Sequence, residues 1–243
     1  MPAPPRFSAN LVRSESLTPQ VRRLVFAQRN PGPLTFAPGQ WVNLLLPLEG
    51  GAAPLRRAYS IASPPSADGT FELAITRVEG GPGSNFLHAL AVGSTLEVEG
   101  PQGFFTRAPS FASPTLFVAT GTGFTPLRSM LLAAAAAGNT TRTHLVLGVR
   151  HEEDLLYREE IDALAVQQPW FTRTFTLSRP GTSWGGARGY VQEHVREALT
   201  TLAAHGEPHV FACGLQRMVS AVRELVRKDL EFPRERMHAE RFD

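Results

Sequence analysis

The sequence predicts two domains, an antiparallel Greek-key β-barrel over residues 1–108 and a doubly wound parallel α/β domain over residues 109–243. Short apolar or alternating runs, separated by turn residues, fill the first hundred positions. After a Pro- and Ser-containing linker at 107–114, the pattern changes to strand, loop and helix in alternation. A chain of 243 residues is also long enough to bury two cores of ordinary size.

The first domain reads as closely spaced strands. They are expected from Arg6 to about Thr106, with examples at residues 21–26, 41–46, 58–62, 71–77 and 95–99. Turns are expected between them at Pro38-Gly39, Pro64-Pro65, Asp68-Gly69 and Gly80-Gly81. Closing such strands into a barrel removes exposed edges, so a barrel is favoured over an open sheet. One helical segment, residues 84–90, interrupts the strands.

The second domain alternates buried strands with helices. Strands are expected at 115–120, 145–149, 171–177, 209–212 and 237–242, and helices at 125–137, 157–167, 190–204 and 215–230. Parallel strands need long crossover connections, and helices supply them. The alternation therefore predicts a parallel sheet with helices on both faces.

Composition excludes several classes of protein. A net charge of +2, from 24 Lys+Arg against 22 Asp+Glu, does not suggest nucleic acid or a membrane surface as partner. The single cysteine, Cys213, rules out a disulfide framework and a cysteine-held iron–sulfur cluster, which needs about four thiolates. No metal site is expected. The start has no signal-peptide pattern, and the longest apolar stretch, 130–137, is far shorter than the roughly 20 residues of a membrane span. We therefore expect a cytoplasmic protein.

A glycine-containing loop, Gly121-Thr122-Gly123, joins a buried strand to a helix. Such a loop lets the backbone approach a pyrophosphate at the helix N-terminus. The sixth position of the usual dinucleotide pattern is Pro126 rather than Gly, and an acidic ribose partner about 20 residues later is missing. The loop alone is as compatible with a tight turn as with a phosphate site.

Two further blocks offer anion-binding chemistry. Period-two alternation puts Arg57 and Tyr59 on one face of a strand, where a guanidinium can bind phosphate and a ring can stack. In Gly80-Gly81-Pro82-Gly83-Ser84, Ser84 is expected to cap the following helix. An isolated block of either kind is equally explained by a barrel-strand tyrosine with an exposed arginine, or by a capped surface turn.

Taken in order, the motifs are specific. Arg57-Ala58-Tyr59-Ser60, Gly81-x-x-Ser84, Gly100-Pro101-x-Gly103, Gly121-Thr122-Gly123-x-Thr125-Pro126 and Cys213-Gly214 are collinear with those of a known family. The chain resembles the ferredoxin–NADP reductase family over nearly its whole length. This resemblance implies FAD in the first domain and NADP(H) in the second.

The resemblance also implies roles for individual residues. Arg57, Ala58, Tyr59 and Ser60 would bind FAD, with Tyr59 packed on the isoalloxazine and Ser60 near flavin N5. The turn that contains Gly81, Gly83 and Ser84 would bind the flavin phosphates. Ser60, Cys213 and Glu240 would form the catalytic set, and the near-terminal Phe242 would cover the flavin. The alternative is that both residues are purely structural, with Phe242 in the core beside a last edge strand and Cys213 a small buried hydrophobic residue.

For the pyridine nucleotide, the resemblance assigns a second set. The pyrophosphate would meet Thr120, Gly121, Gly123 and Thr125, and the nicotinamide would meet Cys213 and Gly214. Ser178 and Arg179, assisted by Arg150, would bind the ribose 2′-phosphate, which favours NADPH over NADH. Residues 150–154 also resemble NADH-using members of the family.

The implied function is a flavin-dependent reductase that exchanges a hydride with NADP(H) and single electrons with ferredoxin or flavodoxin. Arg56, Arg77 and Arg107 are candidates for docking an acidic carrier. Three alternatives remain at this point: the reductase component of an oxygenase, a free-flavin or ferric reductase, and a non-catalytic flavin or nucleotide sensor.

Overall fold

The computed structural model describes residues 4–30, 32–47 and 53–242. The chain forms two compact units. The first unit comprises residues 1–108 together with 128–133, and the second comprises residues 109–127 and 134–243. Among the described residues, no helix combines the length and the apolar character that crossing a membrane requires.

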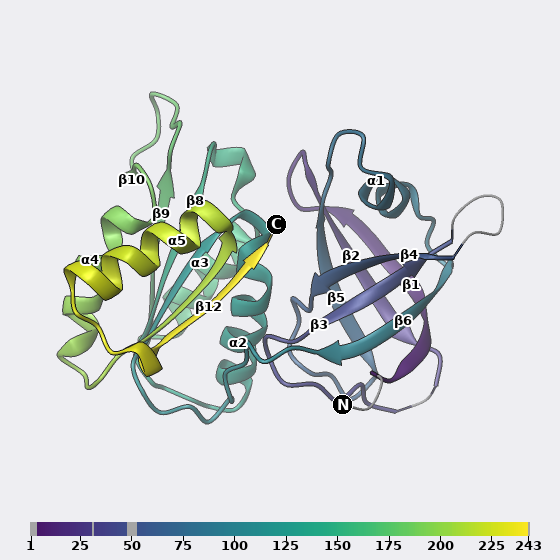
Figure 1. Ribbon diagram of the computed structural model, residues 1–243, viewed down its shortest axis with the longest axis horizontal. Coiled ribbons are helices and arrows are strands. Elements are labelled where there is room, and N and C mark those ends of the chain that lie inside the picture. The colour runs from purple at the N-terminus through teal and green to yellow at the C-terminus, as the bar shows by residue number, and fades with distance from the viewer. Residues whose placement is uncertain (1–3, 31, 48–52, 243) are drawn as a thin grey trace. The chain divides into compact units, whose positions relative to one another are not determined.

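A six-stranded antiparallel sheet forms the first unit (Figure 1). Its strands follow the order β4-β3-β6-β1-β2-β5 and are β1 (Arg6–Ser16), β2 (Val21–Gln28), β3 (Trp41–Leu46), β4 (Leu55–Ser60), β5 (Thr70–Thr76) and β6 (Thr95–Gln102). The sheet curls until its two ends meet, because the Ala62 N–H, just after β4, donates to the Glu72 carbonyl of β5 at 2.8 Å. The predicted antiparallel barrel is confirmed.

Alternating apolar residues on these strands fill the barrel. Leu24 and Phe26 of β2, Val42 and Leu44 of β3, and Phe71 of β5 are fully buried in one core cluster. Burying one such side chain stabilises the fold by about 1.5–3 kcal/mol. Helix α1 (Pro82–Ala89) adds its buried Leu87 to the same core.

Several predicted boundaries shift in the first unit, and two of the shifts have a clear physical cause. The strand expected at 58–62 is β4 (Leu55–Ser60). It ends early because the next amides leave the ladder: Ile61 N–H donates to the Gln40 carbonyl and Ala62 N–H to Glu72. The helix expected at 84–90 begins at Pro82, which is tolerated in a first turn because it needs no N–H donor there.

The second unit is a parallel sheet with the strand order β10-β9-β8-β7-β11-β12. Its strands are β7 (Thr115–Thr120), β8 (Thr143–Val149), β9 (Phe171–Leu177), β10 (Ala187–Arg188), β11 (His209–Leu215) and β12 (Met237–Phe242). The helices are α2 (Phe124–Ala136), α3 (Arg158–Gln167), α4 (Gln192–Ala203) and α5 (Gln216–Glu224). Helices α4 and α5 share a buried core with one face of the sheet, and α3 lies behind it (Figure 1). The predicted parallel α/β fold is confirmed.

Candidate cofactor sites

Strand β4 presents Arg57 and Tyr59 on one face, as its alternation predicts. They lie opposite Leu44 and Val42 of β3, and cross-strand neighbours point to the same side of a sheet. Tyr59 is half-buried against the barrel core, and this burial raises the pKa of its phenol while the charge of Arg57 opposes the shift. Arg57 and Ala58 are exposed, whereas Ser60 is buried. The strand therefore offers a solvent-facing cation beside a flat aromatic surface.

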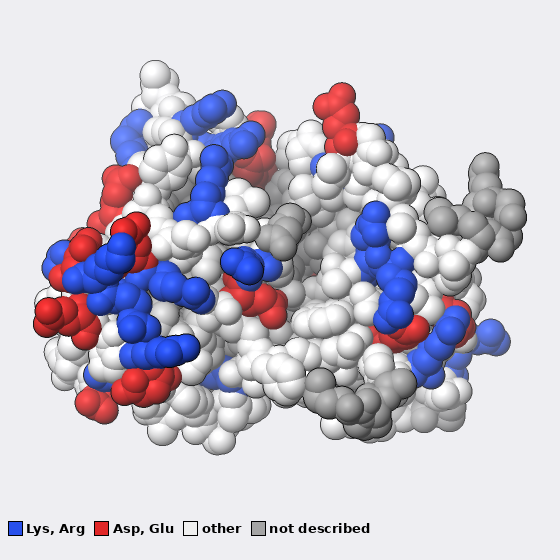
Figure 2. Space-filling view, in the orientation of Figure 1, with Lys and Arg blue, Asp and Glu red and all other residues white. Residues whose placement is uncertain are grey.

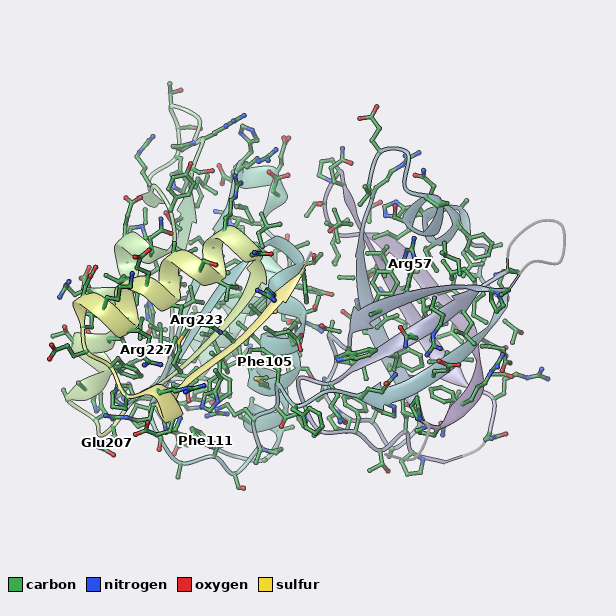
Figure 3. All side chains as sticks on the ribbon, viewed as in Figure 1. Arg57, Phe105, Phe111, Glu207, Arg223 and Arg227 are labelled. Carbon is green, nitrogen blue, oxygen red and sulfur yellow. The ribbon has the colours of Figure 1, made fainter. Side chains whose placement is uncertain are left out.

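The side chain of Arg57 lies directly against the start of α1 (Figure 3). A Cβ atom at Gly83 would be 3.0 Å from Arg57 Cγ and 3.3 Å from its Nε. The first N–H groups of a helix have no acceptor within the helix and attract anions. The fold thus brings together the two features that the sequence suggested separately as phosphate-binding elements.

The predicted capping role of Ser84 is wrong. The N-cap of α1 is Gly81, with extended backbone, and no side chain caps the helix. Ser84 is buried in the first turn, where its hydroxyl accepts a bond from the Val78 N–H at 3.0 Å and lies 3.2 Å from the Gly81 carbonyl. Its hydroxyl is engaged with the protein's own backbone, so a phosphate would be reached by backbone N–H groups and by Arg57.

In the second unit, the segment after β7 touches the carboxyl end of β11 at a glycine, Gly123. The two strands are parallel neighbours, with Ala119 opposite Cys213. A Cβ atom at Gly123 would be 2.3 Å from the Cys213 carbonyl oxygen, so no other residue fits without backbone movement. This contact places the loop Gly121–Gly123 beside Cys213-Gly214. The two blocks predicted to meet one nucleotide therefore form one surface of the sheet edge.

Polar groups at this edge fit a bound ligand. The buried hydroxyl oxygen of Thr120, at the end of β7, has no hydrogen-bond partner among the described residues. An orphaned buried hydroxyl is costly unless a ligand or water satisfies it. Thr125, in the first turn of α2, donates its own hydroxyl to the Thr122 carbonyl at 2.8 Å, which fixes the loop that precedes the helix.

Cys213 and Glu240 lie opposite each other on β11 and β12. The cysteine is fully buried. Burial, with a further contribution from the charge of Glu240, raises the pKa of the Cys213 thiol well above its ordinary value. A neutral thiol suits a residue that lines a pocket and does not suit a nucleophile. Phe242 ends β12 opposite Leu215 and is half-buried, outside the fully buried core.

The residues predicted for the ribose phosphate meet at the carboxyl ends of β8 and β9. The Ser178 N–H donates to the Val149 carbonyl at 3.0 Å, and the Arg179 N–H donates to the Arg150 carbonyl at 2.9 Å. Both arginines are exposed. Two guanidinium groups and one hydroxyl therefore stand on adjacent loops, a suitable set for a dianion.

Family models match both halves of the chain. The Oxidoreductase FAD-binding domain matches residues 8–106, and the Oxidoreductase NAD-binding domain matches residues 117–224. Ferredoxin–NADP reductase B of Sorangium cellulosum (strain So ce56) is 53% identical over 240 residues, which cover 98% of this chain and 98% of that protein. The chain belongs to the ferredoxin–NADP reductase family. The predicted family, its enzymatic character, and its FAD and pyridine-nucleotide cofactors are thereby confirmed.

Other members of this wider group are less similar. The phenol 2-monooxygenase reductase component DmpP of Pseudomonas sp. (strain CF600) is 33% identical over 78% of this chain and 53% of its own length. The Amycolatopsis cytochrome P450 reductase GcoB superposes with a TM-score of 0.84 at 26% identity, over 98% of this chain and 70% of that chain. A ferredoxin NADP+ reductase from Neisseria gonorrhoeae shares the fold, with a TM-score of 0.80 at 19% identity over 97% of this chain and 98% of that chain.

One residue that is a candidate for nucleotide binding, Tyr190, was not identified from the sequence. Tyr190 was assigned to the first turn of a helix, but α4 begins at Gln192, and the Tyr190 side chain is 59% exposed. The preceding Gly189 N–H donates to the Leu177 carbonyl at 3.0 Å, which ties this loop to the end of β9. An exposed aromatic near Ser178 can stack on an adenine ring. The Gly-Tyr pair after a short polar loop was the available signal.

Three surface arginines were predicted to attract an acidic electron carrier, and the prediction is wrong for one of them, Arg107. Arg107 is only 3% exposed, and burial lowers its pKa to about 10. Arg56 is exposed and pairs with Glu99, and Arg77 is exposed and donates to Asn85 at 3.3 Å. In the second unit, basic and acidic side chains are interspersed over α4 and α5 (Figure 2), as the near-balanced net charge predicts.

Proposed function

We propose that the chain is a ferredoxin–NADP reductase that transfers a hydride between NADP(H) and FAD and single electrons between FAD and a ferredoxin or flavodoxin. Residues 1–108 bind FAD in this proposal, and residues 109–243 bind NADP(H). The observation that carries it is the 53% identity to the Sorangium reductase, because it extends over 98% of both chains and so includes both cofactor-binding halves. FAD supplies the chemistry that couples a two-electron donor to a one-electron carrier.

On the flavin side, the proposal assigns the pyrophosphate to Arg57 and to the backbone N–H groups that follow Gly81. The contact between Arg57 and Gly83 supports it, since both donors then face one anion. Tyr59 offers its ring to the isoalloxazine. Ser60 donates a hydrogen bond near N5, and its burial keeps water away from that bond.

On the nucleotide side, the loop from Thr120 to Thr125 receives the pyrophosphate. The unpartnered hydroxyl of Thr120 supports this role. Cys213, kept neutral by burial, packs against the nicotinamide, and Glu240 holds or moves a proton beside it. Phe242 covers the flavin ring until nicotinamide takes its place.

We propose NADPH rather than NADH as the preferred nucleotide. The 2′-phosphate distinguishes the two, and exposed Arg150 and Arg179 with Ser178 provide its ligands. The exposed arginines Arg56 and Arg77 remain as the proposed docking points for an acidic carrier.

The first test is anaerobic stopped-flow mixing of the FAD-loaded protein with NADPH or NADH, with flavin absorbance as the signal. Fast bleaching by NADPH and much slower bleaching by NADH is the expected result. Bleaching by neither nucleotide would overturn the reductase proposal and leave a flavin- or nucleotide-binding sensor. Electron delivery to ferredoxin is measured next, in a coupled assay with a purified bacterial ferredoxin.

A second candidate is the reductase component of an oxygenase system, favoured by the 33% identity to DmpP. A preference for NADH in the stopped-flow experiment would select it. The single cysteine means that such a component would pass its electrons to a separate iron–sulfur protein.

A further inference from the structure

A chain of charged side chains runs from α2 into the barrel. Arg128 and Glu72 are each 5% exposed, and their Nη1 and Oε1 atoms lie 3.2 Å apart. The other carboxylate oxygen of Glu72 binds Arg23 at 2.5 Å, and Arg23 continues to Glu15 at 2.6 Å. Arg128 lies in α2 but belongs to the first unit. A buried ion pair is a poor stabiliser compared with apolar packing, so its position calls for another explanation.

The pair surrounds the short segment that follows β4. Arg128 Nη1 donates to the Ala62 carbonyl at 2.7 Å, and the Ser129 hydroxyl donates to the Ser63 carbonyl at 2.7 Å. From the other side, the Glu72 carbonyl accepts the Ala62 N–H at 2.8 Å, and the Glu72 N–H donates to the Ser63 hydroxyl at 3.1 Å. Four hydrogen bonds from two elements therefore fix two consecutive residues.

This segment needs such support because of where β4 lies. β4 stands at the end of the described strand order and pairs along its length with β3. Its last residue is the buried Ser60, next to Tyr59. After Ser60 the chain is held by main-chain bonds from Ile61 to Gln40 and from Ala62 to Glu72. The side chains of α2 that bind this segment are those of Arg128 and Ser129.

We propose that Arg128 and Glu72 are positioning residues for FAD: the Glu72 carboxylate holds the Arg128 guanidinium, which clamps the Ala62 carbonyl and thereby keeps Ser60 and Tyr59 in the orientation that the isoalloxazine requires. The inference rests on the proposed function, which places the side chains of Tyr59 and Ser60 against the flavin. It predicts that loss of the clamp weakens and distorts FAD binding, beyond any loss of stability.

The test compares Arg128→Met with the double variant Glu72→Gln/Arg128→Met, in which no buried charge of the pair is left unpartnered. FAD affinity is measured by quenching of flavin fluorescence, the flavin environment by visible circular dichroism, and stability by thermal unfolding. Both variants should bind FAD about tenfold more weakly, the effect of losing one hydrogen bond to a charged group. They should also show an altered visible circular dichroism spectrum.

Asn139→Ala is the matched control. Asn139 donates to the Pro109 and Phe111 carbonyls at 2.7 and 2.9 Å, within the second unit. Its loss should lower the melting temperature without changing the flavin spectrum or FAD affinity. A double variant that folds and binds FAD as wild type does, with the same spectrum, would overturn the clamp. Failure of the wild-type protein to bind FAD would instead refute the proposed function itself.

Discussion

Gly83 and Arg57 are in such close contact that a Cβ atom at position 83 would lie 3.0 Å from the arginine Cγ. The start of α1 can therefore approach the guanidinium because residue 83 has no side chain. This contact places the barrel strand beside the helix N-terminus, and together they form the surface that we propose for the flavin pyrophosphate. The contact joins a glycine-containing turn to an Arg-x-Tyr strand, although Arg57 and Gly83 are 26 positions apart in the sequence.

Removing the guanidinium should weaken FAD binding with little effect on folding. For Arg57→Ala we expect the dissociation constant for FAD to rise about 10- to 100-fold, because hydrogen bonds to charged groups contribute about 1.5–3 kcal/mol. Fluorescence titration of the apoprotein measures it. Arg56→Ala is the control, since Arg56 is the adjacent residue and pairs with Glu99. Equal losses in both variants would contradict the assignment.

A methyl group at Gly123 should disturb the nucleotide side alone. The added Cβ would meet the Cys213 carbonyl at 2.3 Å, and such overpacking costs about 1–3 kcal/mol. We expect Gly123→Ala to have a lower melting temperature and weaker NADPH binding, with unchanged FAD content. At Gly181 nothing lies within 4 Å of an added Cβ, so Gly181→Ala is the comparison. Normal NADPH affinity in Gly123→Ala would argue against a nucleotide at this loop.

Selectivity between the two nucleotides should depend on Arg179. For Arg179→Ala we expect the KM for NADPH to rise by about tenfold or more and the KM for NADH to stay nearly constant, because only NADPH carries the 2′-phosphate that a guanidinium binds. Steady-state assays with ferricyanide as acceptor supply both values. The same change with both nucleotides would remove the 2′-phosphate assignment.

Tyr190 should act on the part that NADPH and NADH share. If its exposed ring stacks on adenine, Tyr190→Ala should raise the KM for both nucleotides by a similar factor, about 5- to 100-fold for a stacking contact of 1–3 kcal/mol. Tyr190→Phe keeps the ring and should behave as wild type. A loss in the Phe variant would point to the hydroxyl group instead.

Acid should destabilise the protein partly through His144. Burial lowers the pKa of this histidine to about 4. Its ring nitrogens Nδ1 and Nε2 form hydrogen bonds with the hydroxyls of Thr172, at 2.7 Å, and Thr174, at 3.1 Å. Below pH 6.5 this histidine is protonated in the unfolded chain but stays neutral in the folded chain. The free energy of unfolding therefore falls as the pH is lowered from 6.5 to 4. The loss reaches about 2 kcal/mol at pH 4.5.

His144→Gln, which can still hydrogen-bond to threonine, should reduce this pH dependence by about the same 2 kcal/mol. Urea unfolding at pH 7 and pH 4.5 measures the difference, and His205→Gln, at an exposed position, is the control. An unchanged difference in His144→Gln would assign the acid sensitivity to other groups.

Much of the fold could be predicted because strands such as Thr115–Thr120 are apolar runs and others, such as Phe171–Leu177, lie between recognisable helices and turns. The bounds expected for Trp41–Leu46, Thr115–Thr120, Phe171–Leu177 and Met237–Phe242 agree with the observed strands. The two-residue strand Ala187–Arg188 was missed, because it has no periodicity and exists only through pairing with β9.

The candidate site was predictable to the extent that its residues lie in local motifs. Arg57 and Gly83 each occur in one, but their contact depends on tertiary packing. The burial of Arg107 could not be predicted, since a linker arginine is normally exposed. The clamp was hidden for the same reason: Arg128 binds groups 66 and 56 positions away in the sequence, at Ala62 and Glu72.

The close contact between Gly123 and the Cys213 carbonyl means that the two ends of the proposed nucleotide site differ in how freely their residues can be substituted. At the proposed nicotinamide end, the backbone at Gly123 lies so close to the Cys213 carbonyl that a side chain at position 123 does not fit without backbone movement. The proposed ribose end consists of the exposed Arg150 and Arg179 with the half-buried Ser178, on loops held by main-chain bonds. Exchange of these few side chains would change the preferred nucleotide from NADPH to NADH, or the reverse, without altering the residues proposed to contact the nicotinamide.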